Sequence, residues 1–256
     1  MAATPDPRIA HMQEQLALPR QNGELVFAAP WEARAFGMAV AEAFLNARFG
    51  NDLVNHHTYA FVGDGCLQEG VGQEMISLAG HLQLGKLVLL WDDNQITDDG
   101  STELSISENV AERFRVAGWH VVELDGHDIE AVSAALDAAR KDPRPSMLAC
   151  RTMIAKGIAR LQGQRGGHSG RLFEEDAQAA RELLDWKYKP FETPAKVQQE
   201  WRAAGQRSAG EHQAWQARIA ALPAAERIEF DRVMRGELPA QWQQVLLDYK
   251  QKALQA

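Results

Sequence analysis

The order of apolar and polar positions along the chain predicts strands that alternate with helices. Short apolar runs bounded by Gly, Asp, Asn or Pro occur at 58–62, 87–91, 119–124 and 146–151. Their length favours buried strands, and helical spacing lies between them. We therefore expect an α/β fold with three layers, in which a parallel sheet carries helices on both faces and right-handed crossovers join the strands.

Two segments show a helical stripe of apolar residues. Gly50 is placed to end the first helix, over 32–49, whose apolar positions are Ala33, Phe36, Val40, Phe44 and Ala47. The second stripe follows residue 65 and consists of Leu67, Val71, Met75, Leu78 and Leu82. These stripes predict the helix faces that pack against the sheet.

The pattern divides the chain into three parts. Residues 1–30 contain Pro and Gly and no sustained period, so we expect a loosely docked tail. Residues 31–185 hold the alternating strands and helices. In residues 186–256 prolines interrupt short helical stretches and tryptophans recur, which predicts a helical, linker-like extension.

Composition and charge exclude several classes of protein. With 256 residues, 45% of them hydrophobic, the chain is typical of a globular protein, and its net charge of −8 argues against nucleic acid. No apolar run reaches the length of a membrane span, and the N-terminus lacks an apolar leader, so we expect a cytoplasmic protein without membrane contact. Cys66 and Cys150 lack metal-site spacing and are expected as buried thiols in a reducing compartment.

Candidate chemistry gathers where two of the predicted strands end. Asp64 lies between Gly63 and Gly65 directly after the first strand, and Asn94 follows the second strand behind Asp92 and Asp93. Adjacent parallel strands bring their carboxyl-side loops together, where open α/β sheets bind ligands. Carboxylate and amide oxygens suit Mg²⁺ or Ca²⁺, with a diphosphate completing the shell. The alternative is that these residues only shape turns, which Asp and Asn favour.

The text around these residues resembles the transketolase family of thiamine diphosphate enzymes. The likeness runs from about residue 32 to 194 and is carried by GDGCLQEGV, SLAGHLQLGKLVLLWDDNQIT, RFRVAGWHVVELDGHD, TMIAKG, GGHSGRLF and LLDWKYKPFETP. By this resemblance the Asp64 and Asn94 side chains and the Ile96 carbonyl bind Mg²⁺ or Ca²⁺. Gly65 and Asn94 would also hold the diphosphate of the cofactor, thiamine diphosphate.

The resemblance implies roles for three further residues. His168 matches a histidine that lies over the diphosphate and faces the sugar, whereas its simplest alternative is a solvent-exposed histidine in a Gly-rich loop. Glu69 and Glu74 match acidic residues that link two cofactor sites across a dimer interface. Glu69 could equally be a carboxylate that suits the start of a helix.

The implied activity moves a two-carbon ketol unit from a ketose phosphate to an aldose phosphate, in the pentose phosphate pathway. Family members have diphosphate-binding, pyrimidine-binding and C-terminal domains, and this chain resembles the first, truncated at its front. We expect no turnover unless a second chain supplies the pyrimidine-binding domain, in a homo- or hetero-oligomer. The alternatives are an inactive remnant and a binding module for a related full-length protein.

The sequence departs from the family pattern at three places. LVFAAPW, at residues 25–31, stands where the family has a glycine-rich loop, so side chains should crowd the diphosphate. Asp98 replaces an apolar residue and adds negative charge near an anion site. The family's HGAPL reads HSGRL around His168, which introduces Arg171.

Overall fold

The computed structural model describes residues 30–255, which form two compact units. Residues 1–29 lie outside the described residues, and with them nearly all of the expected tail and most of the altered loop at 25–31. The first unit comprises residues 30–44 and 56–189, and the second comprises residues 45–55 and 190–255. Each unit is described by itself.

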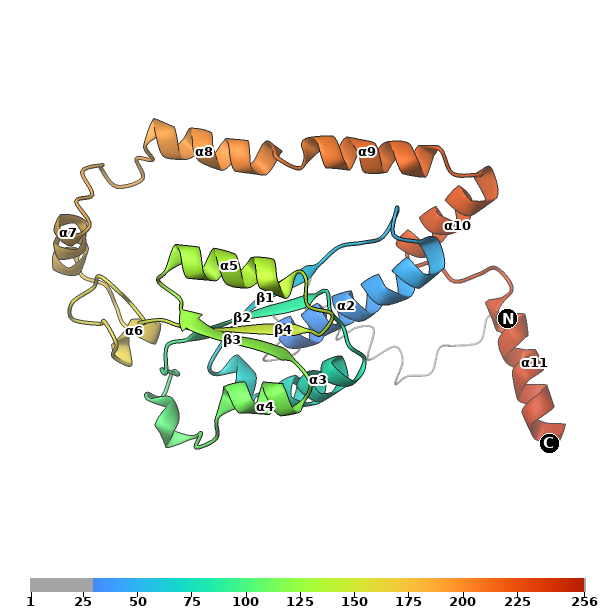
Figure 1. Ribbon diagram of the computed structural model, residues 1–256, viewed down its shortest axis with the longest axis horizontal. Coiled ribbons are helices and arrows are strands. Elements are labelled where there is room, and N and C mark those ends of the chain that lie inside the picture. The colour runs from blue at the N-terminus through green and yellow to red at the C-terminus, as the bar shows by residue number, and fades with distance from the viewer. Residues whose placement is uncertain (1–29, 256) are drawn as a thin grey trace, which may run out of the picture. The chain divides into compact units, whose positions relative to one another are not determined.

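A four-stranded parallel sheet forms the centre of the first unit (Figure 1). Its strands lie in the spatial order β1-β2-β4-β3 and are β1 (Thr58–Gly63), β2 (Leu87–Asp93), β3 (His120–Asp125) and β4 (Ser146–Arg151). The four predicted strands are confirmed, with each boundary displaced by two residues or fewer. Because all pairs are parallel, every strand ends at the same edge of the sheet.

Helices cover both faces of this sheet, as the strand–helix alternation predicts. One face packs against α2 (Pro30–Phe49), α3 (Gly70–His81) and α4 (Val110–Val116) around a core that includes Phe114, Met147 and Trp119. The opposite face packs against α5 (Ile129–Ala139) through Ala135, Ala139, Val88 and Leu148. Figure 1 shows α5 on one side of the strands and α3 and α4 on the other. The three-layer α/β prediction is therefore confirmed.

The edge strand β1 keeps apolar side chains exposed on the α5 side. Phe61 pairs with Leu90 and Tyr59 with Val88, so these aromatic rings share a face with the smaller core. The cluster beneath α5 draws its residues from β2, β3 and β4, and Phe61 is 77% exposed. One part of the sheet thus presents aromatic surface to solvent.

The predicted helix faces are partly wrong. In α3 the buried positions are Gly72, Ile76, Ala79 and Gly80, whereas Leu78 and Leu82 are exposed. In α2 the core contacts centre on Ala35 and Ala39, with Phe36 and Val40 partly buried and Phe44 exposed. Small residues face the sheet because they let the helix backbone approach it closely, so the largest apolar side chains do not mark the contact face.

The remaining elements continue the chain on either side of residue 190. Two 3₁₀ turns and two helices complete the first unit: η1 (Cys66–Gln68), η2 (Thr102–Leu104), α6 (Gly166–Ser169) and α7 (Glu174–Leu183). The second unit contains α8 (Ala195–Gln206), α9 (Ala209–Ala220), α10 (Ala224–Met234) and α11 (Trp242–Gln255).

A tryptophan anchors the second unit to its own short N-terminal piece. Trp215 Nε1 donates to the Leu53 carbonyl at 2.9 Å, and Arg218 Nε donates to the Asp52 carbonyl at 2.7 Å. The rings of Phe49 and Phe230 meet edge to face with centroids 5.1 Å apart. These contacts explain why residues 45–55 group with a part of the chain more than 130 positions away.

Two smaller expectations can be compared with the structure. Cys150 is buried as expected, whereas Cys66 is only partly buried, and the two are not joined by a disulfide. Among residues 30–255, no helix combines the length and the apolar character needed to cross a membrane.

Gly80 allows the close approach of α3 to the end of α4 and provides a test of this packing. A Cβ at Gly80 would lie 1.8 Å from the Ala117 carbonyl oxygen, whereas one at Gly37 in α2 would meet nothing within 4 Å. We expect Gly80→Ala to lower the free energy of unfolding by about 2 kcal/mol, through overpacking against backbone. Gly37→Ala should be neutral or slightly stabilising, because Ala is the better helix former. Urea denaturation of both variants measures this, and equal stabilities would contradict the packing.

Candidate functional site

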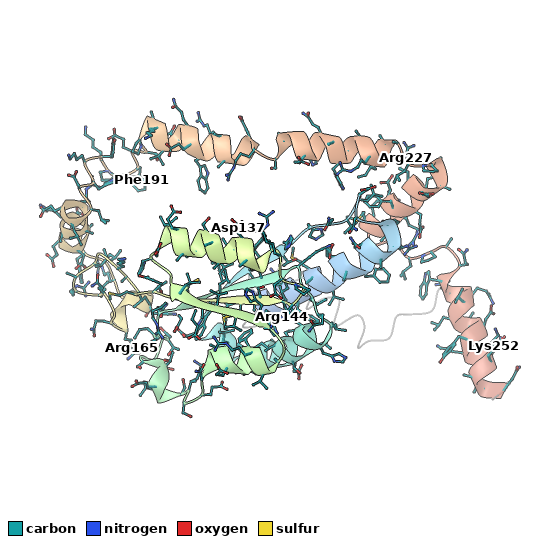
Figure 2. All side chains as sticks on the ribbon, viewed as in Figure 1. Asp137, Arg144, Arg165, Phe191, Arg227 and Lys252 are labelled. Carbon is teal, nitrogen blue, oxygen red and sulfur yellow. The ribbon has the colours of Figure 1, made fainter. Side chains whose placement is uncertain are left out.

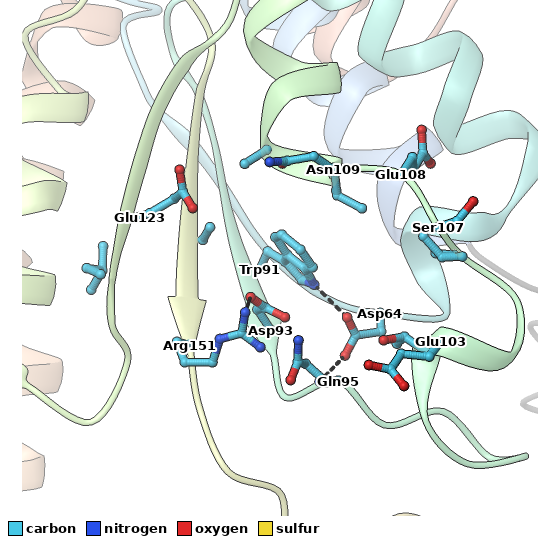
Figure 3. Close-up of a pocket in the computed structure, with 16 residues that line it drawn as sticks. Asp64, Trp91, Asp93, Gln95, Glu103, Ser107, Glu108, Asn109, Glu123 and Arg151 are labelled. Carbon is cyan, nitrogen blue, oxygen red and sulfur yellow. Dashed lines mark hydrogen bonds and ion pairs between the residues drawn. The ribbon is translucent and has the colours of Figure 1, made fainter.

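Asp64 joins the loops that follow β1 and β2. Its Oδ2 accepts a hydrogen bond from the Gln95 backbone N–H at 3.0 Å, and its Oδ1 accepts one from Trp91 Nε1 at 3.3 Å (Figure 3). Trp91 belongs to β2, and Gln95, with a φ of 62°, turns the chain directly after that strand. The expectation that Asp64 and the Asn94 segment meet at one edge of the sheet is confirmed.

Hydrogen bonds orient Asn94 and shape the loop around it. Its Nδ2 donates to Asp92 Oδ2 at 3.2 Å, and its Oδ1 accepts from the Ile96 N–H at 3.0 Å. Ile96 lies in a narrow hairpin, because Thr97 N donates to the Gly100 carbonyl and Thr102 N to the Gln95 carbonyl, at 2.7 and 3.0 Å. Asp64 therefore contacts the loop that carries both Asn94 and Ile96, directly after β2.

Burial makes the charge on Asp64 costly. The residue is 5% exposed, and burial, together with the negative charge of Asp93, raises the pKa of Asp64 to about 6. Burial also raises the pKa of Asp93, although Arg151, whose guanidinium lies 2.9 Å from Asp93 Oδ2, opposes that rise. Among the described residues no basic side chain forms an ion pair with Asp64. A cation at this edge would relieve both carboxylates.

The glycines that flank Asp64 leave open space beside it. A Cβ at Gly63 or Gly65 would meet no atom within 4 Å, so the backbone there is accessible from outside. Glu69 is partly buried at the N-cap of α3, where its side chain makes no capping hydrogen bond, and Glu74 is exposed on the same helix. Within residues 30–255 no cluster of three or more His, Cys, Asp or Glu side chains is arranged to hold a metal. A metal ion at this position would therefore be coordinated by one carboxylate, by neutral oxygen atoms of the protein and by oxygens of a bound small molecule.

A cavity of about 550 Å³ lies beside Asp64 at the carboxyl edge of the sheet. Figure 3 shows Trp91, Asp93 and Arg151 on one side of it and residues of the loop before α4, among them Glu103 and Asn109, on the other. Among the described residues that line it, acidic side chains outnumber basic ones, and Arg151 is the single Lys or Arg. The cavity therefore favours cationic over anionic groups.

His168 lies on a segment that contacts the loop after β2. Its Nδ1 is 3.3 Å from Asp98 Oδ1, and its imidazole is 48% exposed. The turn that carries it is tight: a Cβ at Gly170 would be 2.2 Å from the Gly166 carbonyl oxygen, so this position requires glycine. The structure places His168 against Asp98, and none of its hydrogen bonds or ion pairs joins it to Asp64 or Asn94.

The far end of this segment is fixed by Arg160. Its guanidinium forms two hydrogen bonds with the Asp176 carboxylate, at 3.1 and 2.7 Å, and a third with the Arg171 carbonyl at 2.9 Å. The Arg160 hydrogen bonds lower the pKa of Asp176, which therefore stays charged and also accepts from the Phe173 N–H at 3.0 Å. Arg171, one of the departures from the family pattern, lies over the Phe173 ring at 5.4 Å.

Sequence reasoning missed three residues that build the site. Trp91 was part of a predicted buried strand, and only the indole N–H, a donor that seeks a partner when buried, hinted at its contact with Asp64. Arg151 ends β4 and gave no signal, because its partner Asp93 is distant in sequence. Gln95 acts through its backbone N–H, which the identity of a side chain does not reveal.

Known proteins share this fold. Residues 32–239 match the family model described as transketolase, thiamine diphosphate binding domain, and the chain belongs to the transketolase family. A transketolase of Cereibacter sphaeroides is 47% identical over 197 residues, which cover 77% of this chain and 30% of that protein.

Solved structures agree. Transketolase from Leishmania mexicana superposes with a TM-score of 0.77 at 37% identity, covering 82% of this chain and 33% of that one. A Pichia stipitis transketolase in complex with sedoheptulose-7-phosphate gives a TM-score of 0.74 at 37% identity, over 81% of this chain and 32% of that one. The chain spans about a third of the length of the relatives it matches.

The raised pKa of Asp64 predicts a pH dependence that Asp64→Asn removes. An exposed aspartate titrates near 3.9, so between about pH 4 and pH 6 the folded state holds more protons than the unfolded state. The free energy of unfolding should therefore fall as the pH rises through this window, by up to about 3 kcal/mol from this group. The difference in free energy of unfolding between Asp64→Asn and the parent should therefore shift by roughly 2 kcal/mol in favour of Asp64→Asn between pH 4 and pH 7.

Urea denaturation at several pH values, without divalent cations, measures the difference between the two proteins. Asp99→Asn, at an exposed position near the same loop, controls for the loss of one negative charge. If the difference in free energy of unfolding between Asp64→Asn and the parent does not change with pH, burial does not raise the pKa of Asp64.

Proposed function

We propose that this chain binds thiamine diphosphate through a divalent cation, Mg²⁺ or Ca²⁺, and supplies the diphosphate-binding part of a ketol-transferring enzyme. The observation that carries the proposal is the contact of Asp64, at the end of β1, with the loop after β2 that holds Asn94 and Ile96. Membership in the transketolase family supports the cofactor. On this proposal residues 31–185 form the diphosphate-binding domain and residues 186–256 a helical extension.

The residues present fit a hard divalent cation. Asp64 offers a carboxylate whose negative charge is buried and lacks a basic partner among the described residues, and each of its oxygens accepts one hydrogen bond, which leaves lone pairs for a metal. Asn94 Oδ1 likewise has one partner, the Ile96 N–H. Mg²⁺ usually takes one or two carboxylates and completes its octahedral shell with waters and ligand phosphates. The open backbone at Gly65 would let diphosphate oxygens complete that shell.

The chain's own residues would bind and orient the cofactor. Thiamine diphosphate, when bound, supplies the carbon centre that carries the two-carbon unit. Asp64 and Asn94 would hold its diphosphate through the metal, and the hairpin around Ile96 would present a carbonyl to the same ion. His168, whose Nδ1 lies against Asp98, keeps Nε2 for the cofactor or the sugar. Glu69, partly buried at the start of α3, would contribute to the contact between cofactor sites in an oligomer.

Sugar phosphates are the proposed substrates. The Pichia stipitis relative carries sedoheptulose-7-phosphate, a ketose phosphate, which is the class of donor that a ketol transfer requires. On this basis we place the protein in the pentose phosphate pathway, and the cytoplasm is the compartment that the sequence leads us to expect. The pyrimidine-binding partner would be either a further part of the polypeptide or a second chain.

Loss of the Asp64 carboxylate should abolish cofactor binding that depends on Mg²⁺. Isothermal titration calorimetry with thiamine diphosphate and Mg²⁺ should detect binding to the parent and at least a hundredfold weaker binding to Asp64→Asn. Asp99→Asn, which removes the same charge from an exposed position nearby, should bind like the parent. If Asp64→Asn and the parent bind the cofactor with equal affinity, Asp64 is not a metal ligand and only shapes the turn.

Residues 1–256 by themselves should not turn over ketose phosphates. Proton transfer needs a positioned acid or base within hydrogen-bond reach, and the family's carboxylate for this step comes from the pyrimidine-binding domain. A coupled ketol-transfer assay on chain purified free of host transketolase should give no rate above background. Adding a pyrimidine-binding domain of a close relative should restore it. Turnover by the chain alone that disappears in Asp64→Asn would show a complete site and refute this expectation.

A further inference from the structure

One residue, Asp98, contacts three residues of the segment that carries His168. Its carboxylate Oδ1 lies 3.3 Å from His168 Nδ1 and accepts a hydrogen bond from Ser169 Oγ at 3.2 Å. Its backbone carbonyl accepts a hydrogen bond from Arg165 Nε at 2.8 Å. We call these contacts of Asp98 with Arg165, His168 and Ser169 the Asp98 clasp.

The clasp joins two parts of the chain that are about 70 positions apart in sequence. Asp98 lies at the tip of the hairpin that follows Ile96, whereas Arg165, labelled in Figure 2, leads into α6. Two departures from the family pattern meet here: Asp98 stands where an apolar residue is usual, and Ser169 stands where HGAPL has glycine. An apolar residue at position 98 would remove the carboxylate contact with His168, and glycine at position 169 would remove the hydrogen bond from Ser169 Oγ.

The clasp fixes the near end of a short segment whose far end is already held. Arg160 binds the Arg171 carbonyl and the Asp176 carboxylate, so residues 165–171 lie between two anchors. The backbone hydrogen bonds that close this segment span single turns. Gly167 N donates to the Gln164 carbonyl at 2.8 Å, His168 N to the Arg165 carbonyl at 3.0 Å, and Gly170 N to the Gly166 carbonyl at 2.8 Å. Such a turn has little stability of its own. Its order therefore depends on the anchors at its two ends.

We propose that Asp98 is a positioning residue, which holds His168 in register with the hairpin that contains Asn94 and Ile96. The inference rests on the proposed function, because the position of His168 matters only if a cofactor binds at that hairpin. By engaging Nδ1, Asp98 sets the ring so that Nε2 is the nitrogen left for a ligand. Without the clasp, binding would first have to order residues 165–170, which weakens the measured affinity.

The test compares three variants. Asp98→Leu removes the side-chain acceptor, Asp98→Asn keeps an oxygen at the same position and should rescue the clasp, and Asp99→Leu makes the same change of charge at the adjacent exposed residue. Hydrogen–deuterium exchange of residues 165–170, without ligand, is the first readout. We expect exchange about threefold to tenfold faster in Asp98→Leu, and exchange like the parent's in Asp98→Asn and Asp99→Leu.

The ring nitrogens of His168 give a second readout that a purely structural role would not move. In the parent and in Asp98→Asn, ¹⁵N shifts should report a hydrogen-bonded Nδ1, and in Asp98→Leu this signature should disappear. The third readout is calorimetric affinity for thiamine diphosphate with Mg²⁺. Its Kd should be about threefold or more higher in Asp98→Leu than in Asp99→Leu, since both variants lose one negative charge.

The outcomes separate the clasp from the proposed function. Equal exchange in Asp98→Leu, Asp99→Leu and the parent would overturn the clasp. Faster exchange with an equal Kd in the two leucine variants would overturn the positioning role. Failure of the parent to bind thiamine diphosphate would overturn the proposed function and with it the role toward a cofactor, while the difference in exchange and the His168 shifts would still show the clasp.

Discussion

The carboxylate of Asp64 is buried at the end of β1, where it accepts hydrogen bonds from Trp91 of β2 and from the backbone of Gln95. Two strands and the loop between Asn94 and Thr102 are tied together through this one group. Hydrogen bonds to a buried charge are strong, yet two of them do not replace the hydration that the carboxylate has lost, and its pKa rises to about 6. The negative charge of Asp64 is therefore only partly compensated by the described residues around it.

The neighbouring basic residue compensates the charge of Asp93 and leaves that of Asp64 unpaired among the described residues. Arg151 pairs with Asp93 at 2.9 Å and offsets part of the cost of burying it, but it makes no ion pair with Asp64. Had Arg151 paired with Asp64, the edge of the sheet would be more stable and a cation would gain less by binding there. Functional sites commonly contain strained or unpaired groups that lower the stability of the folded protein but favour ligand binding.

Beyond this edge, the position of His168 depends on contacts made by residues that depart from the family pattern. Asp98 was expected to weaken diphosphate binding by repulsion, and in the structure its charge is directed to His168 and Ser169. Arg171 departs from the family's HGAPL, and in the structure its carbonyl accepts a hydrogen bond from Arg160 while its side chain lies over Phe173. Both substitutions thus have partners within the same unit.

The sequence alone determined the four strands and the meeting of Asp64 with the Asn94 loop, because runs of buried strand residues and Gly-flanked polar residues at strand ends are local patterns. It did not determine which faces of α2 and α3 pack on the sheet. Those faces carry Ala35, Ala39 and Ala79, and small residues leave a weaker apolar signal than the exposed Phe44 and Leu78. Only the tertiary structure decided the partners of Asp64, Asp93 and Asp98, since each lies 27 or more positions from its main partner, and no local pattern encodes a contact between loops that the sheet brings together.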